Sequence, residues 1–160
     1  MAPFARTMTW LETRVPPPLV MLCCAGVSWA LAGWLPTWRL QNAGLLWCAI
    51  PVAVCGLALN LLPKLQFARA ATTVNPLAPH RATQLVSSGL YRYSRNPMYL
   101  GQALLLLAWT LLLQHPLALV GLVGFVAWVT RLQIVPEERV LSARFPAAFA
   151  RLSARTRRWL

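Results

Sequence analysis

Three stretches without a single Asp, Glu, Lys or Arg dominate this sequence and limit what the chain can fold into. They cover residues 15–38, 40–63 and 96–130. A helix needs about 20 apolar residues to cross the hydrocarbon core of a bilayer, which is about 30 Å thick. The first two stretches each allow one crossing. The third allows two short crossings, because Gln114-His115-Pro116 interrupts it with a helix breaker where a hairpin would turn.

We therefore predict an all-α, polytopic membrane protein that forms a single domain over residues 1–160. The expected transmembrane spans are roughly 17–36, 42–62, 97–113 and 117–134. A further helix, from Glu137 to about residue 156, is expected to be amphipathic and to lie in the membrane interface. Its apolar positions recur at near-helical spacing: Leu141, Phe145, Phe149 and Leu152.

The charge composition narrows the class of protein. There are 15 Lys and Arg against 3 acidic residues, so the net charge is +12, yet charged residues are only 11% of the chain. Such basicity is also found in nucleic-acid-binding proteins, but a mean hydropathy of +0.55 indicates a membrane protein with basic loops. The three acids are all Glu, which excludes an EF-hand and any site that needs an Asp ligand or nucleophile.

The distribution of cations predicts the orientation. With four spans, every Lys and Arg except Arg39 falls on one side: in the N-terminal segment, in the loop 64–96, or from Arg131 onward. By the positive-inside rule, both termini and the long loop are expected to be cytoplasmic, and the charge needs no nucleic-acid partner. The alternative is a signal peptide cleaved after Ala30-Leu31-Ala32, which the continuing apolar run disfavours.

No metal site is predicted. The four cysteines lie in the first two spans without zinc-ligand spacing, and such thiols usually behave as small apolar residues. His115 is expected at the membrane face opposite the long loop, and His80 is a weak candidate for a proton acceptor.

Function is expected in the two cytoplasmic segments, 64–96 and 131–160. Two of the three acids, Glu137 and Glu138, are adjacent there. Helices that begin at Asn96-Pro97 and at Pro136 would aim unpaired N–H groups at the same region. Helix caps and topology explain each feature alone, but together they predict a pocket for a ligand that carries both an ammonium and a carboxylate group.

Three motifs in these segments resemble a known family. They are Gly89-Leu90-Tyr91, then Arg95-Asn96-Pro97-Met98-Tyr99-Leu100-Gly101, and later Glu137-Glu138-Arg139-Val140-Leu141 followed by Phe145. In this order and spacing they resemble the isoprenylcysteine carboxyl methyltransferase family, which is related to the phospholipid N-methyltransferases. The resemblance covers roughly residues 70–160.

The resemblance implies an integral membrane methyltransferase that binds S-adenosylmethionine in a cytoplasmic pocket built from about residues 70–101 and 133–160. Arg95 and Glu138 are the implied catalytic residues. The acceptor is implied to be a lipophilic small molecule, a lipid or a prenylated compound that enters from the bilayer. By position, the cofactor-binding residues would be Gln84, Leu85, Val86, Tyr91, Asn96, Pro97, Met98, Tyr99 and Glu137.

The sequence departs from the family pattern at two positions. Asn96 stands where the family has His, and Gln133, the implied substrate-binding residue, stands where it has an Arg that faces the substrate. An Arg holds a carboxylate through two parallel N–H groups and Gln cannot, so the acceptor group stays open among carboxylate, amine, thiol and phenol. The alternative function is a non-catalytic four-helix membrane protein, acting as a lipid-binding or assembly subunit, in which the motifs serve only as helix caps.

Overall fold

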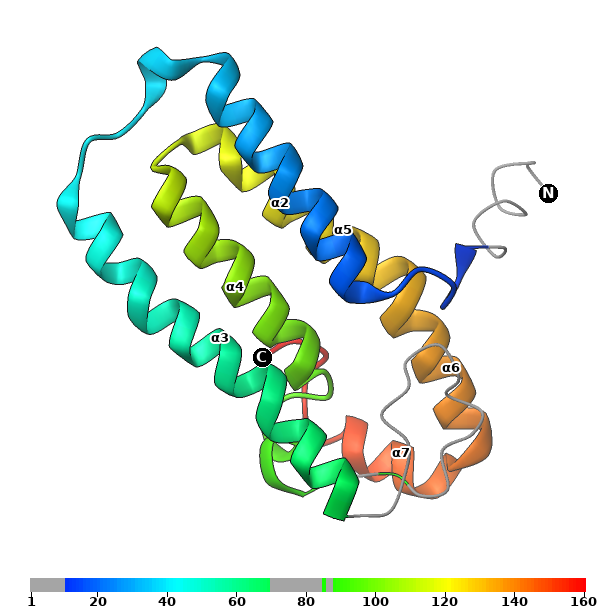
Figure 1. Cartoon of the computed structure of the whole chain (residues 1–160). Helices are drawn as coiled ribbons and strands as arrows, with labels where there is room; N and C mark the ends of the chain where they lie inside the picture. The colour runs from blue at the N-terminus through cyan, green and yellow to red at the C-terminus, as the bar shows by residue number, and fades with distance from the viewer. Residues whose placement is uncertain (1–10, 70–84, 86–87) are drawn as a thin grey trace.

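The computed structural model describes residues 11–69, 85 and 88–160, and this part of the chain is all-α. Four helical rods lie side by side and alternate in direction (Figure 1). They are α2 (Pro17–Trp34), α3 (Ala43–Arg69), α4 (Pro97–Leu113), and α5 (Leu119–Val129) continued by α6 (Val135–Arg144). The shorter α7 (Pro146–Ser153) lies at one end of the bundle. The predicted fold class is confirmed.

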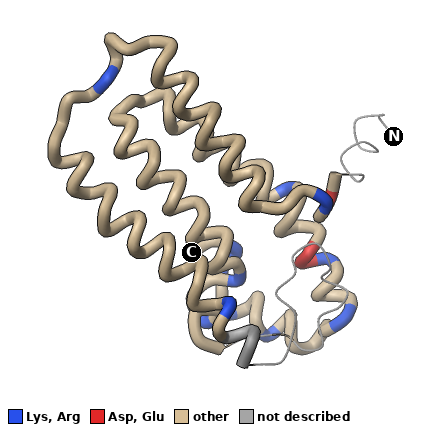
Figure 2. The backbone as a smooth tube through the Cα atoms, viewed as in Figure 1, with Lys and Arg blue, Asp and Glu red and all other residues tan. Residues whose placement is uncertain are grey.

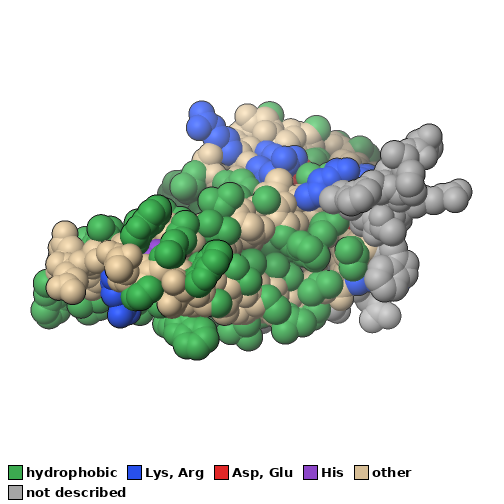
Figure 3. All heavy atoms as spheres, turned by 90° about the horizontal axis from the view of Figure 1, so that it is seen from above, with side chains coloured by type: hydrophobic (Ala, Val, Ile, Leu, Met, Phe, Trp, Pro, Cys, Tyr) green, Lys and Arg blue, Asp and Glu red, His purple; other side chains and the backbone are tan. Residues whose placement is uncertain are grey.

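Three of the helices are long and apolar enough to cross a membrane: Pro17–Trp34, Ala43–Leu65 and Pro116–Arg144. The fourth predicted span, α4, has 17 residues, and at 1.5 Å per residue it is about 26 Å long, slightly less than the hydrocarbon core. Large apolar side chains point outward from α2, α3 and α5, and the face visible in Figure 3 is covered by apolar side chains over much of its length. The chain is an integral membrane protein.

The backbones of α3 and α4 touch at a pair of glycines. A Cβ placed on Gly56 would lie 2.8 Å from the carbonyl oxygen of Gly101, and one placed on Gly101 would lie 2.6 Å from the carbonyl oxygen of Gly56. Helices in lipid gain little from apolar burial, so close backbone approach through small residues is what holds them together. Any larger side chain at either position separates the two helices.

Short polar contacts close the end of the bundle opposite α7. The Ser28 hydroxyl donates to the Ala118 carbonyl at 2.7 Å, and the His115 ring contacts the Leu35 carbonyl at 2.8 Å through Nε2. Gly121 packs directly against α2, because a Cβ there would overlap Ser28 Oγ. His115 therefore holds a turn at the end away from the predicted site, as expected.

The helix expected to begin at Pro136 does not begin there. The chain runs from α5 through a π-helical segment, Thr130–Ile134, directly into α6, and Pro136 lies within this continuous helix. Pro136 has no N–H to donate to the Leu132 carbonyl four residues earlier. That carbonyl instead accepts from the N–H of Thr13 at 2.9 Å. The prediction of free N–H groups at Pro136 is therefore wrong.

The single helix predicted from Glu137 to about residue 156 is also wrong. It is two helices, because Phe145 leaves the helical region (φ −129°, ψ 57°) and separates α6 from α7. Proline disfavours the helical conformation in the residue before it, and Pro146 follows Phe145. After α7, the last residues turn back toward the start of α4 (Figure 1), where the Arg157 carbonyl accepts from the Arg95 N–H.

The glycine contact gives a stability prediction. Gly101→Ala forces α3 and α4 apart and is expected to lower the stability by about 1–3 kcal/mol, as overpacking does. Thermal unfolding in detergent measures the loss. Gly26→Ala is the matched control, because a Cβ there meets nothing within 4 Å. Equal unfolding midpoints for the two variants would contradict a tight α3–α4 contact.

Candidate functional site

The charged residues gather at one end of the bundle. Figure 2 shows a cation on the loop between α2 and α3, far from the other cations that the structure describes, which lie toward the opposite end of the helices. The isolated cation is Arg39, whose Nε donates to the Leu113 carbonyl at 3.4 Å. The predicted separation of the cations into two ends of the helices is therefore present in the folded chain.

Glu138 binds two guanidinium groups. Arg95 Nε donates to Glu138 Oε1 at 3.1 Å, and Arg158 Nη2 donates to Glu138 Oε2 at 2.7 Å. Arg95 and Glu138 were expected to act in catalysis, and the structure places them in contact. Both carboxylate oxygens accept from cations, so this acid joins the start of α4 to the C-terminal residues.

Glu137 lies in a different environment from its neighbour. The Tyr99 hydroxyl donates to Glu137 Oε1 at 2.5 Å, and Tyr99 itself is buried on the first turn of α4. Adjacent residues on an α-helix point about 100° apart, so the two acids reach different partners. The structure thus separates a carboxylate bound to a phenol from a carboxylate bound to guanidinium groups.

Tyr91 is also buried in this region. It lies in the short 3₁₀ turn Gly89–Arg92, which begins at Gly89 with a positive φ of 61°. Burial, and to a lesser extent the charge of Glu137, raise the pKa of Tyr91 above its ordinary value, so its phenol stays protonated at neutral pH. Tyr91, Tyr99 and Glu137, all predicted cofactor-binding residues, are thereby brought together.

The C-terminal segment pairs with the entry to α4. Ser94 and Arg157 form an isolated parallel bridge, and the Arg95 N–H donates to the Arg157 carbonyl at 3.1 Å. Asn96 is a predicted cofactor-binding residue, and in the structure its side chain makes no capping hydrogen bond to α4 but donates from Nδ2 to the Arg158 carbonyl at 2.9 Å. Asn96 does precede the first helical residue, Pro97, as predicted.

Sequence reasoning missed the role of the last residues. The charge distribution explains Arg158 by topology alone, whereas in the folded chain it binds Glu138. The Trp159 indole N–H donates to Thr130 Oγ1 at 3.2 Å, and its ring packs against the apolar core. In the sequence, these residues are marked only by their position at the end of a basic tail. That position does not distinguish a contact with lipid from a contact with the start of α4.

Gln133, the predicted substrate-binding residue, lies inside the protein. It belongs to the π-helical segment, is 0% exposed, and its Nε2 donates to the Val15 carbonyl at 2.6 Å. No described residue bonds its Oε1. The Gln133 side chain therefore holds the segment just before α2 through its amide nitrogen. Its amide oxygen is buried and accepts no hydrogen bond from a described residue.

The remaining predicted residues have less defined surroundings. Gln84, Val86 and His80 lie outside the described residues, and Leu85 is half-buried. Met98 is half-buried, and its carbonyl accepts from Asn60 Nδ2 of α3 at 3.4 Å. Within residues 11–69, 85 and 88–160 there is no group of three His, Cys, Asp or Glu that could hold a metal ion.

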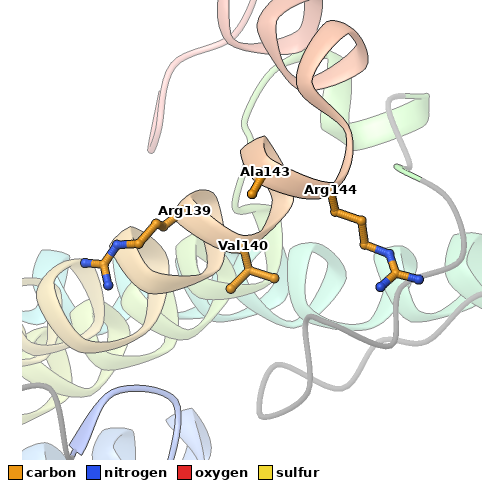
Figure 4. A pocket seen from close by; sticks show the side chains of 4 residues that line it. All are labelled: Arg139, Val140, Ala143 and Arg144. Atoms are coloured by element: carbon orange, nitrogen blue, oxygen red, sulfur yellow. The ribbon is translucent and has the colours of Figure 1, made fainter.

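An open hollow lies on the outer side of α6. Its described lining is Arg139, Val140, Ala143 and Arg144, and Figure 4 shows the two arginines extending to either side of the apolar pair. Arg139 also contacts Glu12 at 3.3 Å. None of the predicted site residues is among those that line it, so the hollow is separate from the Tyr99–Glu137 contact.

The ion pairs give a second stability prediction. Glu138→Gln leaves two partly buried guanidinium groups without a counter-charge and is expected to cost about 1–3 kcal/mol, measured by thermal unfolding in detergent. Glu12→Gln is the control, because its partner Arg139 is 62% exposed and such a pair contributes about 0–1 kcal/mol. An equally small loss in both variants would mean that Glu138 does not join α4 to the C-terminal segment.

Comparison with known proteins identifies the family. The sequence matches the phospholipid methyltransferase family over residues 45–148, which is more than half of the chain. It is also 41% identical over 63 residues, 39% of this chain, to the whole of a Haemophilus influenzae protein described as uncharacterized. No solved structure matches the chain. The chain belongs to the phospholipid methyltransferase family, which includes methyltransferases of the isoprenylcysteine carboxyl methyltransferase type, and the relationship indicated by its motifs is confirmed.

Proposed function

We propose that this member of the phospholipid methyltransferase family uses S-adenosylmethionine to methylate a lipophilic acceptor that reaches it from the bilayer. The observation that carries the proposal is the contact between Tyr99 and Glu137, beside Tyr91, at the entry to α4. These residues come from two segments far apart in the sequence and converge at the end of the bundle where the motifs lie.

The residues present fit this cofactor. Its amino-acid part carries an ammonium group, and Glu137 supplies a carboxylate whose position the buried Tyr99 hydroxyl holds. Its adenosine part requires an apolar wall with polar atoms, which the first turn of α4 and the 3₁₀ turn at Tyr91 would provide. S-adenosylmethionine supplies an activated methyl group, which leaves sulfur as the acceptor heteroatom bonds to it, while the S–C electron pair remains on the sulfur.

The contribution of the protein is then mainly positioning. Orientation of two reactants can lower a barrier by roughly 7–11 kcal/mol in favourable cases, without a strong acid or base. Arg95 and Glu138 neutralise each other and hold the start of α4 against the C-terminal segment. In this proposal they keep Tyr99 in place for Glu137. An acceptor that must lose a proton would pass it to water.

The orientation in the membrane is part of the proposal. Arg39 lies at one end of the helices, and the other described cations lie toward the opposite end, so the positive-inside rule places α6, α7 and the termini in the cytoplasm. The acceptor and cofactor would then meet at the cytoplasmic face. The oligomeric state is not part of this proposal.

Cysteine labelling checks the orientation. In a variant whose native cysteines are replaced by Ala, a cysteine introduced at Thr37 should react with an impermeant maleimide in intact cells. A cysteine at Ser153 should react only after permeabilisation. The reverse pattern would place the site on the outer side.

Cofactor binding checks the activity. Purified protein should bind S-adenosylmethionine, and Glu137→Gln should weaken binding by about tenfold or more, because a charge-assisted contact with the ammonium group is lost. Equilibrium dialysis with labelled cofactor measures the affinity. Glu12→Gln, an acid remote from Tyr99, should leave it within about twofold.

Two outcomes would contradict the proposal. Unchanged affinity in Glu137→Gln would remove Glu137 from the site. Absence of any cofactor binding by the folded wild-type protein would favour the alternative, a lipid-binding or assembly subunit without catalysis.

A further inference from the structure

Glu137 differs from the other two acids of the chain in its partner. Glu12 forms an ion pair with one arginine and Glu138 with two. Glu137 belongs to none of the ion pairs between described residues, and it accepts instead from the Tyr99 hydroxyl at 2.5 Å. A phenol donates a hydrogen bond but brings no positive charge. Within the described structure, Glu137 is therefore a carboxyl group without a counter-charge.

The side chains that face Glu137 from other elements are uncharged and buried. Tyr99, on the first turn of α4, is 6% exposed. Tyr91, in the 3₁₀ turn Gly89–Arg92, is 8% exposed and close enough for the charge of Glu137 to act on it. Glu137 is itself partly buried. Water is thus largely replaced around this carboxyl group by two aromatic residues.

The charged groups at this end of the bundle do not supply the missing cation. Glu138, the next residue on α6, has the same sign of charge as an ionised Glu137. Arg95, before α4, and Arg158, in the C-terminal segment, both direct their guanidinium groups to Glu138 at 3.1 Å and 2.7 Å. Their positive charge is therefore compensated by the neighbouring acid.

An ionised carboxylate in such surroundings has lost much of its hydration without gaining a paired charge. Ionisable groups in this position usually take up a proton and become neutral. The contact with Tyr99 is compatible with a neutral Glu137, because Oε1 accepts from the phenol as a carbonyl oxygen while Oε2 carries the proton. An arriving cation would reverse the balance, because it pairs with the ionised form and not with the neutral one.

We propose that Glu137 carries a proton in the cofactor-free protein and releases it to water when the ammonium group of S-adenosylmethionine binds, so that cofactor binding depends on pH. The O–H bond of the carboxyl group breaks, its electron pair stays on the oxygen, and the resulting carboxylate accepts an N–H from the ammonium group. The ammonium group keeps all its protons. This inference rests on the proposed function, because it describes how the same site takes up its cofactor.

Infrared spectroscopy tests the protonation of the free protein. A neutral carboxyl group has a C=O band that is separate from the carboxylate bands and shifts in D₂O. The chain has three acidic side chains, and the two that pair with arginine are expected to be ionised, as is the C-terminal carboxyl group. At about pH 6.5 in dodecyl maltoside, which has no carbonyl group, the wild-type protein should show this band.

Substitutions assign the band to one residue. Glu137→Gln has nearly the shape of the neutral acid and should remove the band. Glu12→Gln is the matched control, because Glu12 pairs with the exposed Arg139, and it should leave the band unchanged. Addition of S-adenosylmethionine to the wild-type protein should abolish the band.

Isothermal titration calorimetry tests the release of the proton. At about pH 6.5 the amino group of the cofactor is charged, because α-amino groups have a pKa of about 7.7–8.0. Titrations in buffers with different ionisation enthalpies should show close to one proton released per cofactor bound by the wild-type protein, and close to none by Glu137→Gln. Between about pH 5.5 and 6.5, the wild-type affinity should rise by up to about tenfold, and that of Glu137→Gln by less than about twofold.

A second ligand and a second variant identify the source of the proton. 5′-Methylthioadenosine has the nucleoside of the cofactor without its amino-acid part, and it should bind without releasing a proton. Tyr99→Phe removes the phenol and keeps the carboxyl group, so cofactor binding by this variant should still release a proton. Loss of the release in Tyr99→Phe would assign the proton to the phenol and overturn the inference.

The outcomes separate this inference from the proposed function. Absence of the infrared band from the wild-type protein, or its persistence in Glu137→Gln, would show that Glu137 is not the protonated group. Binding of S-adenosylmethionine without proton release would also overturn the inference and leave the proposed function intact. If the band is present and assigned to Glu137 but the protein does not bind the cofactor, the protonated carboxyl group stands and the methyltransferase proposal fails.

Discussion

Inside a membrane, every backbone carbonyl and N–H must find its partner within the protein, and this constraint governs the fold. It explains how Pro136 can lie within a continuous helix. The Leu132 carbonyl that Pro136 leaves without a donor is met by the Thr13 N–H, and the π-helical turn allows Gln133 to bond the Val15 carbonyl nearby. The segment before α2 is thereby fastened to the helix that carries both acids. The irregular π-helical segment thus fixes the position of the residues just before α2.

Glu137 and Glu138, two of the three acids, have different partners. Glu138 gathers Arg95 and Arg158, and so joins the start of α4 to the C-terminal segment. Glu137, the next residue, turns toward the buried Tyr99. A pair of equivalent carboxylates would repel each other, whereas here one is neutralised by cations and the other is held by a phenol. This division leaves Glu137 as the acid suited to a cationic ligand, in accord with a methyl donor that carries an ammonium group.

The close approach of α3 and α4 at Gly56 and Gly101 fixes the height at which α4 begins. The first turn of α4 then presents Tyr99 to Glu137. The helix α4 therefore carries both the small residue that permits close contact with α3 and the polar residue of the candidate site. For a reaction whose donor is already activated, such rigid positioning is the main contribution expected of the protein.

Hydrophobic length, charge distribution and motif spacing are local properties of the chain, and they were enough to predict the four apolar helices, the collection of cations at one end and the family. The α4 bounds, 97–113, were predicted correctly for this reason. The contacts of the folded chain were needed to show that Pro136 lies within a helix, that Pro146 divides the last predicted helix, and that the Asn96 side chain bonds the Arg158 carbonyl. These features depend on hydrogen bonds between residues that are far apart in the sequence, and local sequence patterns do not predict such contacts.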